Sequence, residues 1–284
     1  MVVNHYLYPG CQCDMCTAKI PFKAPEGKSI YMVCNEIPCM YYKNPTANKV
    51  CVYLHGNATC LSDLHASGFP AMLSRTTNSH VITVEYPGYG ICCNRAMDRD
   101  DACCRNVERV LNYIRRKGAS DVVLVGRSLG CGILLKTMAQ NPRLNSLVKQ
   151  VTLISAFSSV KDMCTNDFTR WIINDRLANK RNITALGPDV KVTIVHGVDD
   201  GLVPYEHAKV LSQSRAGSSL VPVHNMGHVM SPNVMVHVAT VIANHLDGIA
   251  STLPNWDADV QEFAAQPEGV APQTASARRS ICPF

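Results

Sequence analysis

From residue 49 onward, short apolar runs alternate with amphipathic helical stretches, and few folds accommodate this alternation. Each run is rich in β-branched residues and almost continuously hydrophobic, as expected of a strand that is buried on both faces. Strands that alternate with helices in this way form a mostly parallel sheet with helices on both of its faces. The predicted strands are Val50–Leu54, Val81–Glu85, Val122–Val125, Val151–Ser155, Val192–His196 and Leu220–His224.

The helices are predicted from apolar residues that line one helical face. In Asp101–Lys117, for example, Val107, Val110 and Ile114 are spaced in this way. Residues 30–42 are typical of a short antiparallel hairpin that precedes the sheet. The other predicted helices are Leu61–Ser74, Leu129–Gln140, Tyr205–Ser214 and Pro232–Leu246.

The chain divides into three parts around this pattern. Residues 1–29 form a cysteine-containing N-terminal segment, residues 30–248 form the α/β domain, and residues 249–284 form a low-complexity tail. The tail is rich in Ala, Pro, Gln and Ser and is predicted to be disordered. Residues 157–188 interrupt the alternation with one helical stretch around Phe168–Ala178. No run of about 18 apolar residues predicts a membrane-spanning helix, and no signal peptide is predicted.

Charge and cysteine content indicate which binding partners and which cellular compartment to expect. The formal charge of +5 contains no long basic block, so nucleic-acid binding is not expected. The mild excess of positive charge could favour binding to an anionic membrane surface. The alternative is that the charges are scattered over the surface and solvated. Fourteen cysteines are present, several of them inside predicted hydrophobic elements. Because free cysteines pack as small hydrophobic residues, they indicate a reducing, cytosolic compartment.

A candidate nucleophile lies directly after the strand that ends at Val125. Gly126-Arg127-Ser128-Leu129-Gly130 follows this strand and opens a helix. A sharp strand-to-helix turn exposes the serine hydroxyl at a helix N-terminus, and the flanking glycines let the neighbouring chain pass closely. The alternative is a glycine-rich turn with a capping serine. The position between strand and helix favours a nucleophile.

A serine hydroxyl needs a base within hydrogen-bond reach. In hydrolases with this motif the chain order is serine, acid, histidine. Two of the ten histidines lie where the last predicted strand ends: His224 is its final residue, and His228 follows shortly after it. Gly227 precedes His228, which suits a ring exposed on a turn, so His228 is the predicted base and His224 the alternative.

The acid is expected in the loop after the penultimate predicted strand. That loop contains two adjacent carboxylates, Asp199 and Asp200. Asp200 lies three residues before Val203 and is the predicted partner of the histidine. Asp199 would then act as a turn residue that bonds its own backbone, and it remains the alternative acid.

An oxyanion hole requires two backbone N–H donors. One is predicted at Leu129, directly after the nucleophile, and the other at Asn57, in the loop after the first long strand. His55 in the same loop is interpreted as a structural residue that braces it. This chemistry needs no cofactor, and no metal site is predicted.

Taken in order, these motifs resemble α/β-hydrolase-domain proteins over roughly residues 49–246. The similarity is greatest to the branch that includes the membrane-associated protein depalmitoylases. It rests on His55–Ala58, Glu85–Gly90, Gly126–Gly130, His196–Asp200 and Gly227–His228. The resemblance implies an α/β-hydrolase fold with a short cap insertion at 157–188. Prolyl-oligopeptidase-type peptidases share the fold and triad, but they usually carry a large propeller domain for which this chain has no room.

The depalmitoylase relatives carry an N-terminal cysteine cluster that is S-palmitoylated and tethers them to membranes. Cys11, Cys13 and Cys16 occupy a comparable place, although this cluster is sparser and lies about ten residues into the chain. Two or more acyl chains hold a protein firmly at a membrane, whereas one does so only marginally. A metal site and ordinary packing are the other interpretations, and zinc would require a fourth ligand.

The residues predict a serine hydrolase that cleaves an ester or a thioester through an acyl-enzyme. The resemblance implies palmitoyl-protein thioesterase activity, with an acylated protein or a small acyl ester or thioester as substrate. A serine peptidase and a small-ester carboxylesterase are the alternatives among enzymes, and a non-catalytic binding protein on the same fold is a third. The expected location is cytoplasmic, peripheral on the cytosolic face of membranes if the cysteines are lipidated.

Overall fold

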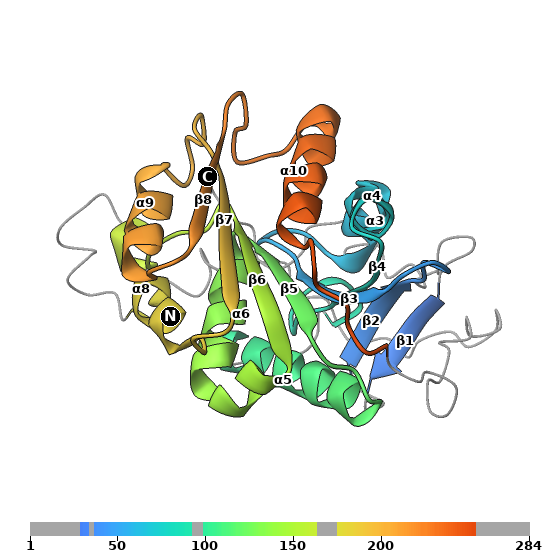
Figure 1. The fold of residues 1–284 in the computed structure, drawn as a ribbon. Coiled ribbons are helices and arrows are strands. Elements are labelled where there is room, and N and C mark those ends of the chain that lie inside the picture. Colours follow the sequence, from blue (N-terminus) through green and yellow to red (C-terminus); the bar gives the residue numbers. More distant parts are fainter. Residues whose placement is uncertain (1–28, 34–36, 93–98, 164–174, 254–284) are drawn as a thin grey trace, which may run out of the picture.

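The computed structural model describes residues 29–33, 37–92, 99–163 and 175–253, and eight strands in these ranges form one sheet (Figure 1). The strand order is β1-β2-β4-β3-β5-β6-β7-β8. β2 pairs antiparallel with β1 and β4, and every later pair is parallel, which confirms the predicted architecture. The strands are β1 Ser29–Val33, β2 Ile37–Tyr42, β3 Lys49–Leu54, β4 Ser79–Val84, β5 Val122–Arg127, β6 Val148–Ile154, β7 Lys191–Gly197 and β8 Ser219–Val223.

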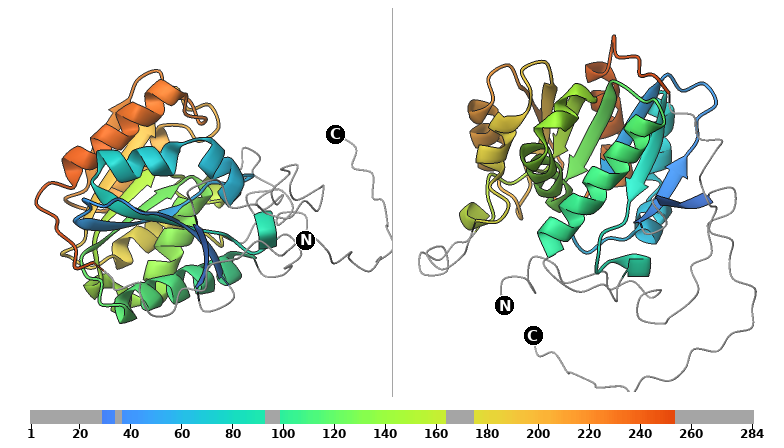
Figure 2. Two further views of the ribbon diagram at one scale, coloured as in Figure 1. Left: turned by 90° about the vertical axis from the view of Figure 1, so that its right-hand side faces the viewer. Right: turned by 90° about the horizontal axis from the view of Figure 1, so that it is seen from below.

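Helices cover both faces of the sheet (Figures 1 and 2). α5, α6 and α9 contribute to one face, where α8 packs against α6 and α9, and α3, α4 and α10 contribute to the other. Among the described residues, no helix combines the length and the hydrophobicity that a bilayer crossing requires. The helices are α3 Leu61–Ala66, α4 Phe69–Thr76, α5 Arg99–Arg116, α6 Leu129–Gln140, α8 Asn179–Asn182, α9 Glu206–Ser214 and α10 Pro232–His245.

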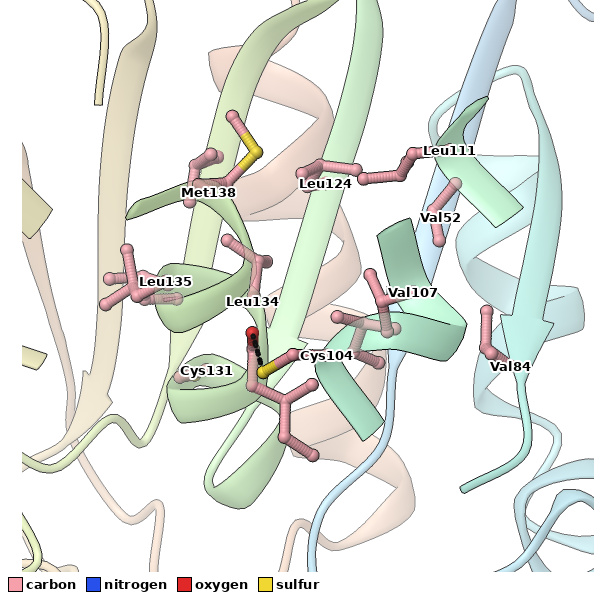
Figure 3. Packing of buried hydrophobic residues seen from close by; sticks show 14 of the residues in the cluster. Val52, Val84, Cys104, Val107, Leu111, Leu124, Cys131, Leu134, Leu135 and Met138 are labelled. Atoms are coloured by element: carbon pink, nitrogen blue, oxygen red, sulfur yellow. Dashed lines mark hydrogen bonds between the residues drawn. The ribbon is translucent and has the colours of Figure 1, made fainter. Parts of the chain in front are cut away.

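The core lies in two layers, one on each face of the sheet, because successive side chains of a strand point to opposite faces. In β5, Val122 and Leu124 belong to the layer under α5 and α6, whereas Val123 and Val125 belong to the layer under α4 and α10. Figure 3 shows the first layer, in which side chains from α5 and α6 meet over the strands. Each buried side chain the size of leucine contributes about 1.5–3 kcal/mol relative to an exposed one.

Two predicted elements differ from the structure. The helix predicted at Leu61–Ser74 is two helices, because the chain turns at Gly68 with a φ of 71° and Pro70 stands in the first turn of α4. The strand predicted at Leu220–His224 was expected to be buried on both faces. β8 is instead the last strand of the sheet and is only partly buried. An edge strand tolerates Pro222, which cannot donate a ladder hydrogen bond.

The predicted insertion at 157–188 is described only in part. Its first residues form a short 3₁₀ turn, Lys161–Met163, and its last ones form α8 and the 3₁₀ turn Ile183–Ala185. Most of the helical stretch predicted around Phe168–Ala178 lies outside the described residues, as do the N-terminal segment up to residue 28 and the tail from residue 254.

The carboxyl ends of the parallel strands gather four loops at one edge of the sheet. Asn57 follows β3, Ser128 follows β5, Asp200 follows β7 and His228 follows β8. In open α/β sheets this edge is where ligands bind. The fold therefore brings all the predicted polar site residues of the domain to one edge.

Candidate active site

Ser128 stands on a strained turn between β5 and α6. Its φ of 50° and ψ of −115° are unusual for a residue with a side chain, and it is the N-cap of α6. The turn is held by hydrogen bonds from the Ser128 N–H to the Ile154 carbonyl, 2.9 Å, and from the Cys131 N–H to the Ser128 carbonyl, 2.9 Å. This backbone presents the hydroxyl at the N-terminus of a helix.

His228 connects Ser128 to Asp200 through both of its ring nitrogens. Its Nδ1 lies 2.8 Å from Asp200 Oδ2, and its Nε2 lies 3.1 Å from Ser128 Oγ. A carboxylate accepts only, so Nδ1 carries the proton and Nε2 is free to accept from the serine hydroxyl. The His228 side chain keeps 16% of its surface exposed, and the Asp200 side chain is fully buried. The ring can thus reach a substrate while its acidic partner is shielded from water.

Asp200 is held as a carboxylate by its own loop. Its Oδ1 accepts the N–H groups of Leu202 at 3.0 Å and Val203 at 2.8 Å. Burial alone raises the pKa of Asp200, but the hydrogen bonds from His228 and from these backbone amides bring the pKa below its ordinary value. The buried His196 lies beside it and bonds the Val203 carbonyl at 2.8 Å. Burial lowers the pKa of His196, which therefore stays neutral next to the carboxylate.

The loops that carry the acid and the histidine are fastened to each other. Asp199 Oδ2 accepts the Asn225 N–H at 2.7 Å. Gly197 packs so closely on this second loop that an added Cβ would lie 2.0 Å from the Met226 carbonyl oxygen. Asp199 was predicted to bond its own backbone; it bonds the other loop instead, because the two loops meet at the sheet edge.

Arg127, which precedes the serine, also holds the histidine loop. Its guanidinium Nη2 donates to the His228 carbonyl at 2.6 Å. Its Nη1 lies 3.1 Å from where a Cβ on Gly56 would stand, so the same side chain borders the loop after β3. Sequence reasoning did not single out this residue. The available signal was a cation at the end of an otherwise apolar strand.

Asn57 and Leu129, the predicted oxyanion donors, belong to adjoining loops. Gly56 lies next to the nucleophile, since a Cβ added there would be 3.6 Å from Ser128 Cβ. Within the described part of the chain, the N–H groups of Asn57 and Leu129 make no hydrogen bond to a protein acceptor. His55 is fully buried and bonds Glu85 Oε1 at 3.3 Å, which confirms its structural role.

Comparisons with known proteins agree with this architecture. No protein-family model matches the chain. It is 27% identical over 192 residues to a protein named as an alpha/beta hydrolase, L404, of Acanthamoeba polyphaga mimivirus, covering 65% of this chain and 68% of that protein. It is 27% identical over 195 residues to human Protein ABHD12B, covering 61% of this chain and 52%, about half, of that relative's length.

A solved structure, an Esterase/Lipase from an uncultured bacterium, matches with a TM-score of 0.60 at 15% sequence identity and covers 84% of this chain and 92% of that one. The chain has the α/β-hydrolase fold. The α/β-hydrolase fold that the motif resemblance implied is thereby confirmed, and the named relatives support a hydrolase of the α/β family.

The alternative triad residues lie elsewhere. His224 is exposed, and among the described contacts it makes none with Ser128 or Asp200. The structure thus brings His228 rather than His224 to the serine, and Asp200 rather than Asp199 to the histidine. Cys11, Cys13 and Cys16 lie outside the described residues.

Two other features of the described residues bear on where a ligand could bind. In the described ranges, no three His, Cys, Asp or Glu side chains converge as metal ligands would. Two hollows of about 300 Å³ lie beside α5, one of them between α5 and the residues that end α6, and neither is lined by Ser128, Asp200 or His228.

Proposed function

We propose that this α/β hydrolase cleaves ester or thioester bonds through an acyl-enzyme, with Ser128 as nucleophile. The single observation that carries the proposal is the continuous hydrogen-bonded chain from Ser128 Oγ through both nitrogens of His228 to Asp200. The three side chains are oriented as their proposed roles require.

In the proposed acylation, Ser128 Oγ attacks the acyl carbonyl while His228 Nε2 takes the hydroxyl proton. The carbonyl oxygen becomes an oxyanion, which the N–H groups of Asn57 and Leu129 stabilise. As the tetrahedral intermediate collapses, the bond to the leaving group breaks and His228 returns the proton to the departing alcohol or thiol. Asp200 stays ionised and stabilises the imidazolium.

Deacylation repeats these steps with water as the nucleophile. His228 takes a proton from the water, whose oxygen attacks the acyl-serine carbonyl. The ester bond to Ser128 Oγ then breaks, the serine regains its proton from His228, and the carboxylic acid leaves. Water and substrate are the only reactants, so the cycle balances without a cofactor.

An apolar acyl group suits the surroundings of the proposed triad. Large apolar side chains on its loops face solvent: Val198 is 38% exposed, Leu202 61% and Val229 83%. Leu202 is two residues from Asp200, and Val229 directly follows His228. Exposed apolar side chains grouped around a polar centre are typical of a binding surface. We therefore propose a fatty acyl chain as the group transferred, and a palmitoyl thioester on protein cysteine as the substrate class.

The enzyme proposal is tested by labelling with a fluorophosphonate probe. Wild-type protein should react at one serine, Ser128→Ala should not react, and His228→Ala should react far more slowly. The exposed Ser146→Ala, whose hydroxyl only bonds the Arg143 carbonyl, is the matched control and should label normally. Wild-type protein that stays unlabelled would refute the proposal.

The acyl specificity is tested with p-nitrophenyl esters of increasing chain length, a palmitoyl-cysteine peptide and unacylated peptides. We expect kcat/KM to rise with chain length and the thioester to be hydrolysed. Turnover limited to acetyl esters would favour a small-ester carboxylesterase, and peptide cleavage without thioester cleavage would favour a peptidase.

We further propose that S-acylation of Cys11, Cys13 and Cys16 holds the protein at the cytosolic face of a membrane. Fractionation of cells that express wild-type protein or the triple Cys→Ser variant tests this. The variant should move to the soluble fraction, and an equal distribution of the two proteins would refute the tether.

A further inference from the structure

The side chain of Asn57 is fixed by two donors on one oxygen. Tyr89, which is fully buried, donates its hydroxyl to Asn57 Oδ1 at 2.6 Å, and the Ala58 N–H donates to the same oxygen at 2.9 Å. An amide oxygen has two lone pairs, and both are used here. Two donors also settle which end of the Asn57 amide is the oxygen. The asparagine is therefore held in one orientation against the backbone of its own loop.

This loop would not keep its conformation unaided. Ala58 has a φ of 51°, in the left-handed region that residues with a Cβ rarely adopt. Such a conformation persists only where the surroundings impose it. The Ala58 N–H is the group that bonds Asn57 Oδ1, so Tyr89 acts on the peptide unit at which the strain is stored.

The segment that contains Tyr89 holds the same loop at two further points. The Tyr86 hydroxyl donates to the His55 carbonyl at 3.0 Å. The Glu85 carboxylate contacts the His55 ring and accepts the Leu61 N–H at 3.1 Å. The segment can wind this tightly because Gly90 has no side chain: a Cβ there would lie 2.1 Å from Glu85 Oε2. Glu85–Gly90 thus encloses the loop after β3.

We propose that Tyr89 is a positioning residue for the oxyanion hole, acting through Asn57. The inference rests on the proposed function, in which the Asn57 N–H stabilises the oxyanion. Donors lower the barrier to the extent that they already point at the developing charge before reaction. The hydrogen bond from the Tyr89 hydroxyl holds Asn57 Oδ1 in place. It thereby fixes the peptide planes on either side of Asn57 and the direction of the Asn57 N–H.

The first test is Tyr89→Phe, which removes only the hydroxyl. We expect kcat to fall roughly tenfold on a p-nitrophenyl ester, less than the about 10²–10³-fold loss that follows removal of a donor itself, with KM unchanged. A merely structural role would change KM and the thermal midpoint together. Tyr42→Phe is the matched control, because Tyr42 is equally buried and its hydroxyl contacts Met40 on β2 and His65 on α3, outside the proposed site.

The second test is a double-mutant cycle with Asn57→Ala, which keeps the backbone N–H and removes the acceptor of the Tyr89 hydroxyl. If Tyr89 acts through Asn57, each single variant loses kcat and the double variant loses no more than Asn57→Ala alone. Asn57 is half-buried, so this variant also serves if Tyr89→Phe does not fold.

Three results would overturn the inference while leaving the proposed function intact: wild-type kcat in Tyr89→Phe, wild-type kcat in Asn57→Ala, or additive losses in the double variant. Failure of the proposed function would be recognised separately, because the wild-type protein would then neither hydrolyse the ester nor react with the fluorophosphonate.

Discussion

Replacement of Gly130 by alanine should disable the proposed site while the fold survives. An added Cβ would lie 2.1 Å from the Leu54 carbonyl oxygen and 2.7 Å from that of His55. Ordinary van der Waals contact begins at 3.4 Å, so α6 or the end of β3 must move by the difference, about 1.3 Å. Both neighbours are backbone and cannot rotate away. This displacement would change the position of Ser128 relative to the loop that contains Asn57.

A misplacement of about 1 Å at reacting groups can lower the rate about 10²-fold, or about 2.7 kcal/mol in transition-state stabilisation. Overpacking of this kind costs about 1–3 kcal/mol in the free energy of unfolding, which a domain of this size tolerates. We therefore expect Gly130→Ala to fold, with a lowered thermal midpoint and kcat/KM on a p-nitrophenyl ester reduced at least about 100-fold.

Gly132→Ala, in the same helix, is the matched control. Its added Cβ would meet Leu177 Cδ1 at 3.0 Å and Phe157 Cζ at 3.1 Å, the far ends of side chains that can shift. Its activity should stay close to that of the wild-type protein. Full kcat/KM in Gly130→Ala would refute the reasoning, and an equal loss in both variants would assign the effect to α6 packing in general.

Three further predictions follow from the site and its supports. Asp200→Asn should lower kcat about 10⁴-fold with little change in KM, whereas His224→Ala should match the wild-type protein in the same esterase assay. Because the pKa of Asp200 is lowered in the fold, its carboxylate stabilises the protein above the unfolded-state pKa of about 3.9, and this contribution disappears as the pH falls through the lower folded-state pKa. In urea unfolding across acid pH, the stability difference between wild-type and Asp200→Asn protein should therefore shrink as the pH drops; a constant difference would contradict this. Lys136→Met should cost at most about 3–5 kcal/mol in urea unfolding, because it removes the 2.9 Å ion pair of the buried Asp100 and leaves that carboxylate its 3.4 Å ion pair with Arg176. Asp101→Asn, at the more exposed partner of the same lysine, should cost at most about 1 kcal/mol.

The sequence predicted the central strands because they are buried on both faces and their hydrophobicity is nearly continuous. One of its two errors concerned a strand whose burial depends on its neighbours in space. The residues of β8 form an apolar run that predicts a strand buried on both faces. β8 is partly exposed because it is the last strand of the described sheet, after β7. The break between α3 and α4 was readable, since Gly68 and Pro70 together mark a helix end and a helix start.

The nucleophile and the base of the candidate site could be predicted because their positions relative to the strands and helices are visible in the sequence. Ser128 follows a strand and opens a helix, and His228 follows a glycine after the last strand. The supports of the site were not predictable in the same way. Tyr89 and Arg127 act across 32 and 101 residues of chain, and no local pattern links them to Asn57 or to the His228 carbonyl.

Two buried cysteines can report how often the helices α5 and α6 separate from the sheet. The seven cysteines within the described residues are all buried. Burial raises the pKa of Cys104 to about 11 and that of Cys131 to about 12. Alkylating reagents attack the thiolate, so these two sites, which pack between α5, α6 and the sheet (Figure 3), should react only when that layer separates. Their alkylation rate under native conditions therefore measures how often α5 and α6 transiently separate from the sheet. The measurement needs no engineered cysteine.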